Sequence, residues 1–287
     1  MENIYHRTTL TAVLLAWATC ANAQWLNHPD ARTPRTRDGK PNLSARAPRA
    51  SNGKPDLSGV WQAHAAQPGE MLRLLQARPG PRSVDQIDPA VDLQTYSKYF
   101  LNVLADFKPG EEPMRPEAAA LLKQHAESQG KDVPTSHCLP GGVPFSTLVA
   151  PFKMIQTPME IVMLLEDNNP PRQIYIDGRK LPANPETMWM GYSVGKWEGD
   201  TLVVDSFGFN DRTWLDAFGH PHSESMRITE RFRRTNFGHM DIEVTMDDPK
   251  MYTRPFTVKF PARLLPDTDT LESVCAENER DRPHLDK

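Results

Sequence analysis

The sequence predicts a mainly β protein: an antiparallel up-and-down β-barrel with an extended N-terminal arm and two or three helices. Two observations lead to this fold class. Between Met154 and Cys275, apolar and polar residues alternate in short runs separated by turn residues, which is the pattern of half-buried strands. The chain also has 27 prolines among its 287 residues, roughly twice the average share, and proline disfavours long helices.

The composition and the absence of several motifs exclude other classes. With 33 Lys and Arg against 37 Asp and Glu, and 38% hydrophobic residues, the chain is neither collagen-like, coiled-coil nor wholly disordered. The G-x-S-x-G, H-E-x-x-H, Walker A and G-x-G-x-x-G motifs do not occur. The familiar hydrolase, zinc protease, NTPase and dinucleotide-binding classes are therefore not predicted.

The N-terminal residues predict export. Arg7 precedes a short apolar run at 10–18, and Ala-Asn-Ala follows at 21–23. This is the layout of a secretory signal peptide, so residues 1–23 are expected to be removed after Ala23; a retained anchor is the alternative. No later window reaches the ~20 apolar residues of a membrane span. The mature chain is expected in the periplasm or outside the cell, without a transmembrane segment.

Residues 24–58 are expected to form an extended, proline-rich, basic arm. A near repeat at 38–44 and 52–58 has turn chemistry in both copies. Seven Lys and Arg stand against two Asp in 24–54, without interleaved aromatic residues, so nucleic acid is not a predicted partner. The arm is expected to lie on the acidic body of the protein or to contact an anionic envelope surface.

Residues 59–287 are expected to form the barrel domain, beginning with a short strand at 59–62. A helical insertion is expected at about 92–130: one helix over 92–107 with Asp92 as N-cap, and a second from Pro116 to about Ser128. Further strands are expected at 159–165, 172–176, 190–197, 202–204, 222–234, 240–246, 256–260 and 271–275. Seven to nine strands joined by consecutive hairpins favour a lipocalin-like barrel that holds one small ligand.

The charge pattern of the strands at 222–234 and 240–246 predicts the type of turn that joins them. A two-residue turn would place Glu230 opposite Glu243, and like charges directly opposed are unfavourable. A bulged turn at 235–237, with Gly238 at positive φ, pairs apolar residues with apolar residues instead.

Export determines which cysteines the mature protein is expected to keep. Cys20 is lost with the signal peptide, and Cys138 and Cys275 remain. Two cysteines in an oxidising compartment predict one disulfide.

The most unusual string is Gly-His-Pro-His-Ser-Glu at 219–224. If a strand begins near His222, then His222, Glu224 and Glu230 share a face with apolar residues, and that face is expected to be the interior. Burying two carboxyl groups beside histidine is unfavourable unless they have a function or a partner, so this face is the candidate site.

Three interpretations of this site remain open. In the first, His220, His222 and Glu224 bind a divalent metal such as Fe(II), Mn or Zn; no other cofactor is predicted. In the second, His222 with Glu224 or Glu230 forms an acid–base pair of the hydratase, lyase or isomerase kind. In the third, the histidines cap the loop and hydrogen-bond the interior acids without any chemistry.

Four further residues are candidates for ligand binding. Asp211 and Arg212 precede the histidine string and are expected at the same mouth of the barrel, where an Asx-turn or a surface ion pair is the alternative role. Tyr175 is expected at a strand end and Tyr192 in mid-strand, with a structural role as the alternative for both.

Several stretches together resemble a known group of proteins. They are 190–204, Gly-Phe-Asn-Asp at 208–211, Gly-His-Pro-His-Ser-Glu at 219–224 and Thr-Glu-Arg-Phe-Arg-Arg at 229–234, with the doubled arm motif. They are similar to a family of exported, mostly uncharacterised, lipocalin-like bacterial proteins, over most of the mature chain. The resemblance implies export and a barrel but no activity and no catalytic roles.

The sequence thus predicts an exported barrel that binds a small, partly apolar molecule, with acid–base chemistry at the His/Glu site as the favoured hypothesis. The alternatives are a non-catalytic periplasmic binding or envelope-interaction module and a metal-dependent enzyme.

Overall fold

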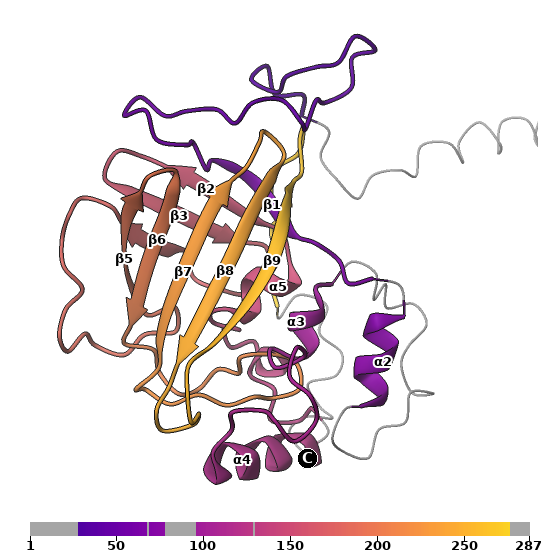
Figure 1. The fold of residues 1–287 in the computed structure, drawn as a ribbon, viewed down its shortest axis with the longest axis vertical. Coiled ribbons are helices and arrows are strands. Elements are labelled where there is room, and N and C mark those ends of the chain that lie inside the picture. Colours follow the sequence, from indigo (N-terminus) through magenta and orange to yellow (C-terminus); the bar gives the residue numbers. More distant parts are fainter. Residues whose placement is uncertain (1–27, 68, 78–95, 129, 276–287) are drawn as a thin grey trace, which may run out of the picture.

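The computed structural model describes residues 28–67, 69–77, 96–128 and 130–275. The expected signal peptide and the expected N-cap Asp92 lie outside these ranges. Nine strands close into a barrel in chain order (Figure 1), which confirms the mainly β barrel class. The strands are β1 Gly59–Ala63, β2 Phe152–Gln156, β3 Glu160–Leu165, β4 Arg172–Tyr175, β5 Tyr192–Glu198, β6 Thr201–Phe207, β7 Arg227–Arg234, β8 His239–Asp247 and β9 Phe256–Leu264.

The expectation of a purely antiparallel barrel is wrong at one place. β4 and β5 pair in parallel, whereas every other neighbouring pair, including β1 with β9, is antiparallel. The two strands run in the same direction because residues 176–191 return the chain along the outside of the barrel, at the left of Figure 1. A hairpin turn is too short to do this.

The strand expected at 271–275 is also absent. β9 is the last strand and pairs with β1 from Leu264 to Ala262, so the closed barrel leaves no edge for another strand. The chain instead runs down the outside, held where Asp269 accepts from Lys153 Nζ at 2.7 Å. No helix in the described ranges is long and apolar enough to cross a membrane.

The register of β7 and β8 agrees with the sequence-based prediction. Glu230 pairs with Val244 rather than with Glu243, and Ile228 pairs with Met246. The reason expected for Gly238 is wrong, because its φ is not positive. A Cβ at Gly238 would lie 2.4 Å from the Cβ of Leu43, so glycine is needed there because the arm packs directly on the turn.

The interior of the barrel is filled with apolar side chains. Residues of β9 alternate strictly between buried and exposed, as expected for a strand with one face inward. Trp61, Phe152, Met163 and Phe232 are each exposed by 1% or less. The barrel interior is therefore a packed core, and space for a ligand must be sought at its ends or on its outer face.

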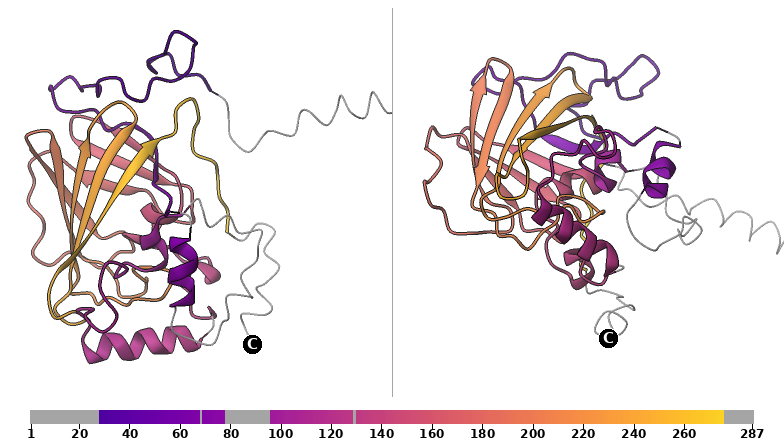
Figure 2. Two further views of the ribbon diagram at one scale, coloured as in Figure 1. Left: turned by 45° about the vertical axis from the view of Figure 1, so that its right-hand side comes forward. Right: turned by 60° about the horizontal axis from the view of Figure 1, so that its bottom comes forward.

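Short helices lie at the lower end of the barrel (Figure 1), and Figure 2 shows α4 crossing below the strands. The described residues contain more of them than the two or three expected. They are α2 Glu70–Gln76, α3 Lys98–Leu101, α4 Pro116–Glu127, the 3₁₀-helix η4 Pro134–His137 and α5 Phe145–Val149. α4 begins at Pro116, as expected from proline at a first helical position.

In the described part of the helix expected over 92–107, residues 96–107, only α3 is helical. Asn102 has an extended backbone, and its side-chain oxygen accepts the N–H of Leu104 at 2.7 Å. The N–H of Val103 donates to the distant Asp216 at 2.7 Å. The N–H groups of Val103 and Leu104 thus donate to side chains instead of to the carbonyl oxygens of a preceding helical turn. The helix therefore ends at Leu101.

The arm lies across the upper end of the barrel (Figure 1). Both copies of its repeat fold into the same small turn, in which Thr36 N–H donates to Lys40 O at 2.8 Å and Ala50 N–H donates to Lys54 O at 2.9 Å. One arginine per copy forms a two-pronged ion pair with the body: Arg35 with Asp267 and Arg49 with Asp200. The basic arm thus lies on acidic groups of the body.

The expected disulfide is confirmed. Cys138 and Cys275 are bonded, with their Cα atoms 5.5 Å apart. The bond joins the segment after η4 to the chain that follows β9.

Candidate functional site

His220 is part of the scaffold of the loop between β6 and β7. Its Nδ1 donates to Asp216 Oδ2 at 2.6 Å, and Asp216 is fully buried. The other oxygen of Asp216 accepts the N–H groups of Phe218 and Gly219 at 3.0 Å. The Asp216 carboxylate accepts hydrogen bonds from main-chain N–H groups of the turn and from the His220 ring. His220 and Asp216 therefore fix the shape of this loop.

His222 is also buried, and both of its ring nitrogens lie near hydrogen-bond partners. Its Nε2 lies 2.7 Å from the Thr213 hydroxyl, and its Nδ1 lies 3.3 Å from the Ser223 carbonyl oxygen. Burial lowers the pKa of His222 below its ordinary value, since the charged form would lose its hydration. His222 is therefore neutral at neutral pH.

Glu224 does not share a face with Glu230, so the expected common interior face is wrong. Glu224 is exposed and lies in a turn before β7 begins at Arg227. The strand does not extend back to His222 because Ser223 is held by Asp248, which accepts the Ser223 N–H at 2.6 Å and its hydroxyl at 2.9 Å.

Glu230 does point into the barrel, where it forms an ion pair with Arg172 of β4. Arg172 Nη1 donates to Glu230 Oε1 at 3.0 Å, and Arg172 Nη2 donates to Oε2. The two side chains are exposed by only 2% and 1%. Ser193 and Ser206 accept further hydrogen bonds from the guanidinium at 3.3 and 3.0 Å. Both carboxylate oxygens of Glu230 thus accept hydrogen bonds from the Arg172 guanidinium.

Arg172 is the residue that the sequence reasoning missed. The signal was present, because Arg172 and Ile174 share one face of β4 and Ile174 is fully buried. An arginine on an interior face predicts an interior acid, and Glu230 was already expected there.

The metal-binding interpretation has no support in the geometry. Within the described ranges, no three His, Cys, Asp or Glu side chains are grouped so that they could hold a metal ion. His220, His222 and Glu224 therefore do not form a triad.

A cavity of about 710 Å³ opens beside the starts of β4 and β5. Tyr175 and Tyr192 line it from the outer face of the barrel, because they alternate with the buried Ile174 and Ser193. Its walls come from β4, β5, the segment before β5, the segment after β6 and the turn before β7. We call it the mouth cavity; the lining residues that matter most are Tyr175, Trp189, Tyr192, Asp211, Arg212 and Glu224. All four sequence-predicted ligand-binding residues line this space, and Glu224 joins them.

Two tyrosines form one wall of the mouth cavity. The ring centroids of Tyr175 and Tyr192 are 5.4 Å apart. Arg179 lies over the Tyr175 ring, with Cζ 3.7 Å from its centroid, and donates to the Tyr192 hydroxyl at 3.1 Å. Asp177 in turn binds the Arg179 guanidinium. Both rings are therefore held in place before any ligand arrives.

Trp189 and Arg212 form a second wall. The guanidinium carbon of Arg212 lies 4.7 Å from the Trp189 ring centroid, within the range of a cation–π interaction. Asp211, Arg212 and Glu224 are exposed, and none of them forms an ion pair with another described residue. Apart from the contact of Arg212 with the Trp189 ring, their charged groups are thus free to meet a ligand.

Close backbone packing makes these walls rigid. Gly191 has φ +63°, and a Cβ there would lie 2.6 Å from the Phe209 ring. The segment before β5 is further tied to the end of β6 by hydrogen bonds between Met188 and both Gly208 and Asn210. The cavity is therefore a preformed hollow rather than a gap between mobile loops.

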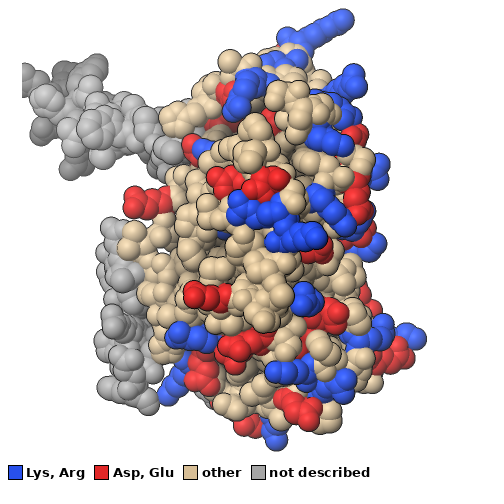
Figure 3. Space-filling view, turned by 90° about the vertical axis from the view of Figure 1, so that its left-hand side faces the viewer, with Lys and Arg blue, Asp and Glu red and all other residues tan. Residues whose placement is uncertain are grey.

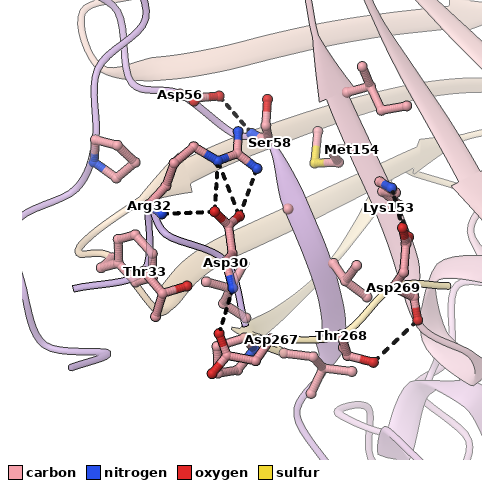
Figure 4. Close-up of a pocket in the computed structure, with 18 of the residues that line it drawn as sticks. Asp30, Arg32, Thr33, Asp56, Ser58, Lys153, Met154, Asp267, Thr268 and Asp269 are labelled. Carbon is pink, nitrogen blue, oxygen red and sulfur yellow. Dashed lines mark hydrogen bonds and ion pairs between the residues drawn. The ribbon is translucent and has the colours of Figure 1, made fainter. Parts of the chain in front are cut away.

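A second cavity of about 670 Å³ lies between the arm and the upper end of the barrel. In this arm cavity Arg32 is paired with Asp30 and Lys153 with Asp269, as Figure 4 shows. Arg234 at its base is buried, donates to main-chain oxygens of Asp56 and Phe237, and has its pKa lowered to about 10 by burial. These charged side chains thus already have partners: Arg32 within the arm, Lys153 within the body, and Arg234 at the main chain of Asp56 in the arm.

The outer face beside β5 has no single-sign patch, because Figure 3 shows acidic and basic side chains interspersed over it. No protein-family model matches the chain, and neither the search of curated proteins nor that of solved structures finds a match. The resemblance to exported lipocalin-like proteins therefore stays a prediction.

Proposed function

We propose that the protein is exported and binds one small, partly apolar molecule in the mouth cavity. The observation that supports this most is the convergence of two tyrosines, one tryptophan and three charged side chains that have no ion pair with another described residue on one preformed space of about 710 Å³. Small-molecule sites are concave, preformed and mostly within roughly 300–1,000 Å³, with a few polar groups that fix orientation.

Binding is favoured over acid–base catalysis because the groups expected to move a proton have other partners. Glu230 is neutralised by Arg172, His220 is bound to Asp216, and His222 is neutral and bound to Thr213. Among the groups expected to move a proton, only Glu224 lines the cavity without an ion pair to another described residue. The expected pair of a histidine and a carboxylate is therefore not assembled at the cavity.

Export is supported by the disulfide between Cys138 and Cys275, since such bonds persist in oxidising compartments. Together with the expected signal peptide, it favours the periplasm or the exterior. An envelope-contact role for the arm comes second, because Arg35 and Arg49 already bind aspartates of the body.

A thermal-unfolding screen of the purified protein against small amphipathic compounds tests the binding proposal. A ligand at about 100 times its Kd stabilises the folded state by ~2.7 kcal/mol, which raises Tm by roughly 5 °C in a chain of this size. The shift should be lost in Trp189→Ala.

The matched control is Arg254→Ala, which removes an exposed arginine that lies over the Phe107 ring and does not line the cavity. It should keep the full ligand-induced shift. Compounds whose shift survives in Trp189→Ala would place the binding site elsewhere, and a screen without any shift would contradict binding.

A further inference from the structure

Resting on the proposed binding function, we infer that the ligand of the mouth cavity is a short neutral oligosaccharide. The inference depends on three properties of the cavity walls. The aromatic rings are fixed; the walls carry both side chains that only donate hydrogen bonds and side chains that only accept them, none of which forms an ion pair with another described residue; and the walls have no excess of positive charge.

The aromatic rings offer flat apolar surfaces. One side of a sugar ring consists of C–H groups, and these pack well against the electron-rich face of an aromatic ring. Tyr175, Tyr192 and Trp189 supply three such rings at the cavity. Arg179 covers one face of Tyr175 and Arg212 covers one face of Trp189, so a sugar would pack on the faces that these arginines leave open. Because Arg179 holds both tyrosines through its ring contact and its hydrogen bond to Tyr192, little side-chain entropy is lost when a ligand packs on them.

The polar groups suit hydroxyls. Arg212 can only donate hydrogen bonds, whereas Asp211 and Glu224 can only accept them when ionised. A hydroxyl group does both, so a polyol can satisfy all three side chains at once. An apolar or purely aromatic ligand would displace water from these three side chains without giving them hydrogen bonds. This desolvation would weaken the binding of such a ligand.

The charges disfavour an anionic ligand. Two cations and two carboxylates line the cavity: Arg172, Arg212, Asp211 and Glu224. Arg172 is already neutralised by Glu230, so one free cation faces two free carboxylates. An anion would meet net repulsion here.

A zwitterion such as a free amino acid is also disfavoured. Asp211, Arg212 and Glu224 are all exposed to solvent, and exposed ion pairs contribute only about 0–1 kcal/mol each. A sugar uses the fixed rings and the exposed donors and acceptors together, whereas the charges of a zwitterion gain little at this site.

Calorimetric titration of the full chain tests the inference. The probes are maltotriose, cellotriose and tri-N-acetylchitotriose as neutral trisaccharides, 4-hydroxybenzoate as an aromatic anion and phenylalanine as a zwitterion. We expect at least one trisaccharide to bind, and neither 4-hydroxybenzoate nor phenylalanine to bind.

Variants locate the binding. Trp189→Ala and Tyr192→Ala should each weaken trisaccharide binding by about tenfold or more, whereas Tyr192→Phe, which keeps the ring and the fold, should stay within about threefold. Arg212→Ala should weaken binding, and Arg254→Ala should not.

Three outcomes would overturn the oligosaccharide inference. If 4-hydroxybenzoate or phenylalanine binds in a Trp189-dependent manner and no trisaccharide does, the ligand class is wrong and the proposed binding function stands. Trisaccharide binding that Trp189→Ala and Tyr192→Ala leave unchanged places the sugar outside the cavity. If no probe binds, the sugar class is wrong, and the thermal-shift screen decides separately whether the binding function also fails.

Discussion

Asp167, in the loop between β3 and β4, is a buried carboxyl group without matching partners. Both of its oxygens are buried and have no hydrogen-bond partner among the described residues, as is true of the Ser146 hydroxyl. Burial raises the pKa of Asp167 above its ordinary value, and the nearby Asn169 and Ser146 side chains offset this only in part. The ionised carboxylate therefore destabilises the folded state at neutral pH.

We predict that Asp167→Asn increases the free energy of unfolding at neutral pH by about 1 kcal/mol, and that the gain shrinks near pH 4. The sign follows from the raised folded pKa. As pH rises from the unfolded value through the folded value, the native state holds the proton more tightly than the unfolded state, so the wild type loses stability in that window. Urea unfolding at both pH values measures the difference.

The exposed Asp241 on β8 provides a control. Asp241→Asn should change stability by less than about 0.5 kcal/mol at either pH. A destabilised Asp167→Asn at neutral pH, or a gain of equal size at both pH values, would contradict the account of Asp167.

At the scale of the elements, four neighbouring strands are braced by one polar network inside the barrel. β4, β5, β6 and β7 each contribute one side chain: Arg172, Ser193, Ser206 and Glu230. This network crosses β4 and β5, which pair over only two residues. A buried ion pair adds little net stability over apolar packing, but breaking it leaves an unpaired buried charge.

We predict that Glu230→Leu or Arg172→Met alone lowers the free energy of unfolding by about 3–5 kcal/mol. The double variant should lose clearly less than the sum of the two, because neither charge is then left alone. Urea unfolding of the four proteins gives this double-mutant cycle. Strict additivity, or single losses below about 1 kcal/mol, would show that the pair is not desolvated as described.

At the scale of the whole molecule, the arm and the disulfide secure opposite ends of the barrel. The arm covers the upper end, where Leu57 is fully buried in the core. The bond between Cys138 and Cys275 joins residues 137 positions apart and connects the lower-end segments to the chain after β9. Closing so long a loop restricts the unfolded chain much more than the folded one.

Replacing both cysteines, Cys138→Ser with Cys275→Ser, should lower the free energy of unfolding by up to about 5 kcal/mol. Urea unfolding with and without reductant measures this. Reductant should destabilise the wild type to the level of the double variant and should leave the variant itself unchanged. Equal stability of the oxidised wild type and the variant would contradict a stabilising role.

The sequence alone determined the features that depend on local pattern or on simple counting. Period-two alternation placed Glu230 inside and set its register against Val244, because a slip by one residue would turn every apolar side chain outward. With Cys20 assigned to the expected signal peptide, Cys138 and Cys275 left one pairing. Proline at position 116 fixed the start of α4.

Only the tertiary structure decided where elements end and which side chains meet. α3 ends where Val103 donates to Asp216, 113 residues away, and β7 starts late because Asp248 holds Ser223. The mouth cavity joins Tyr175, Trp189 and side chains after β6 that no local pattern connects. Local preferences at such positions differ by about 1 kcal/mol or less, so single contacts between distant residues are strong enough to choose among them.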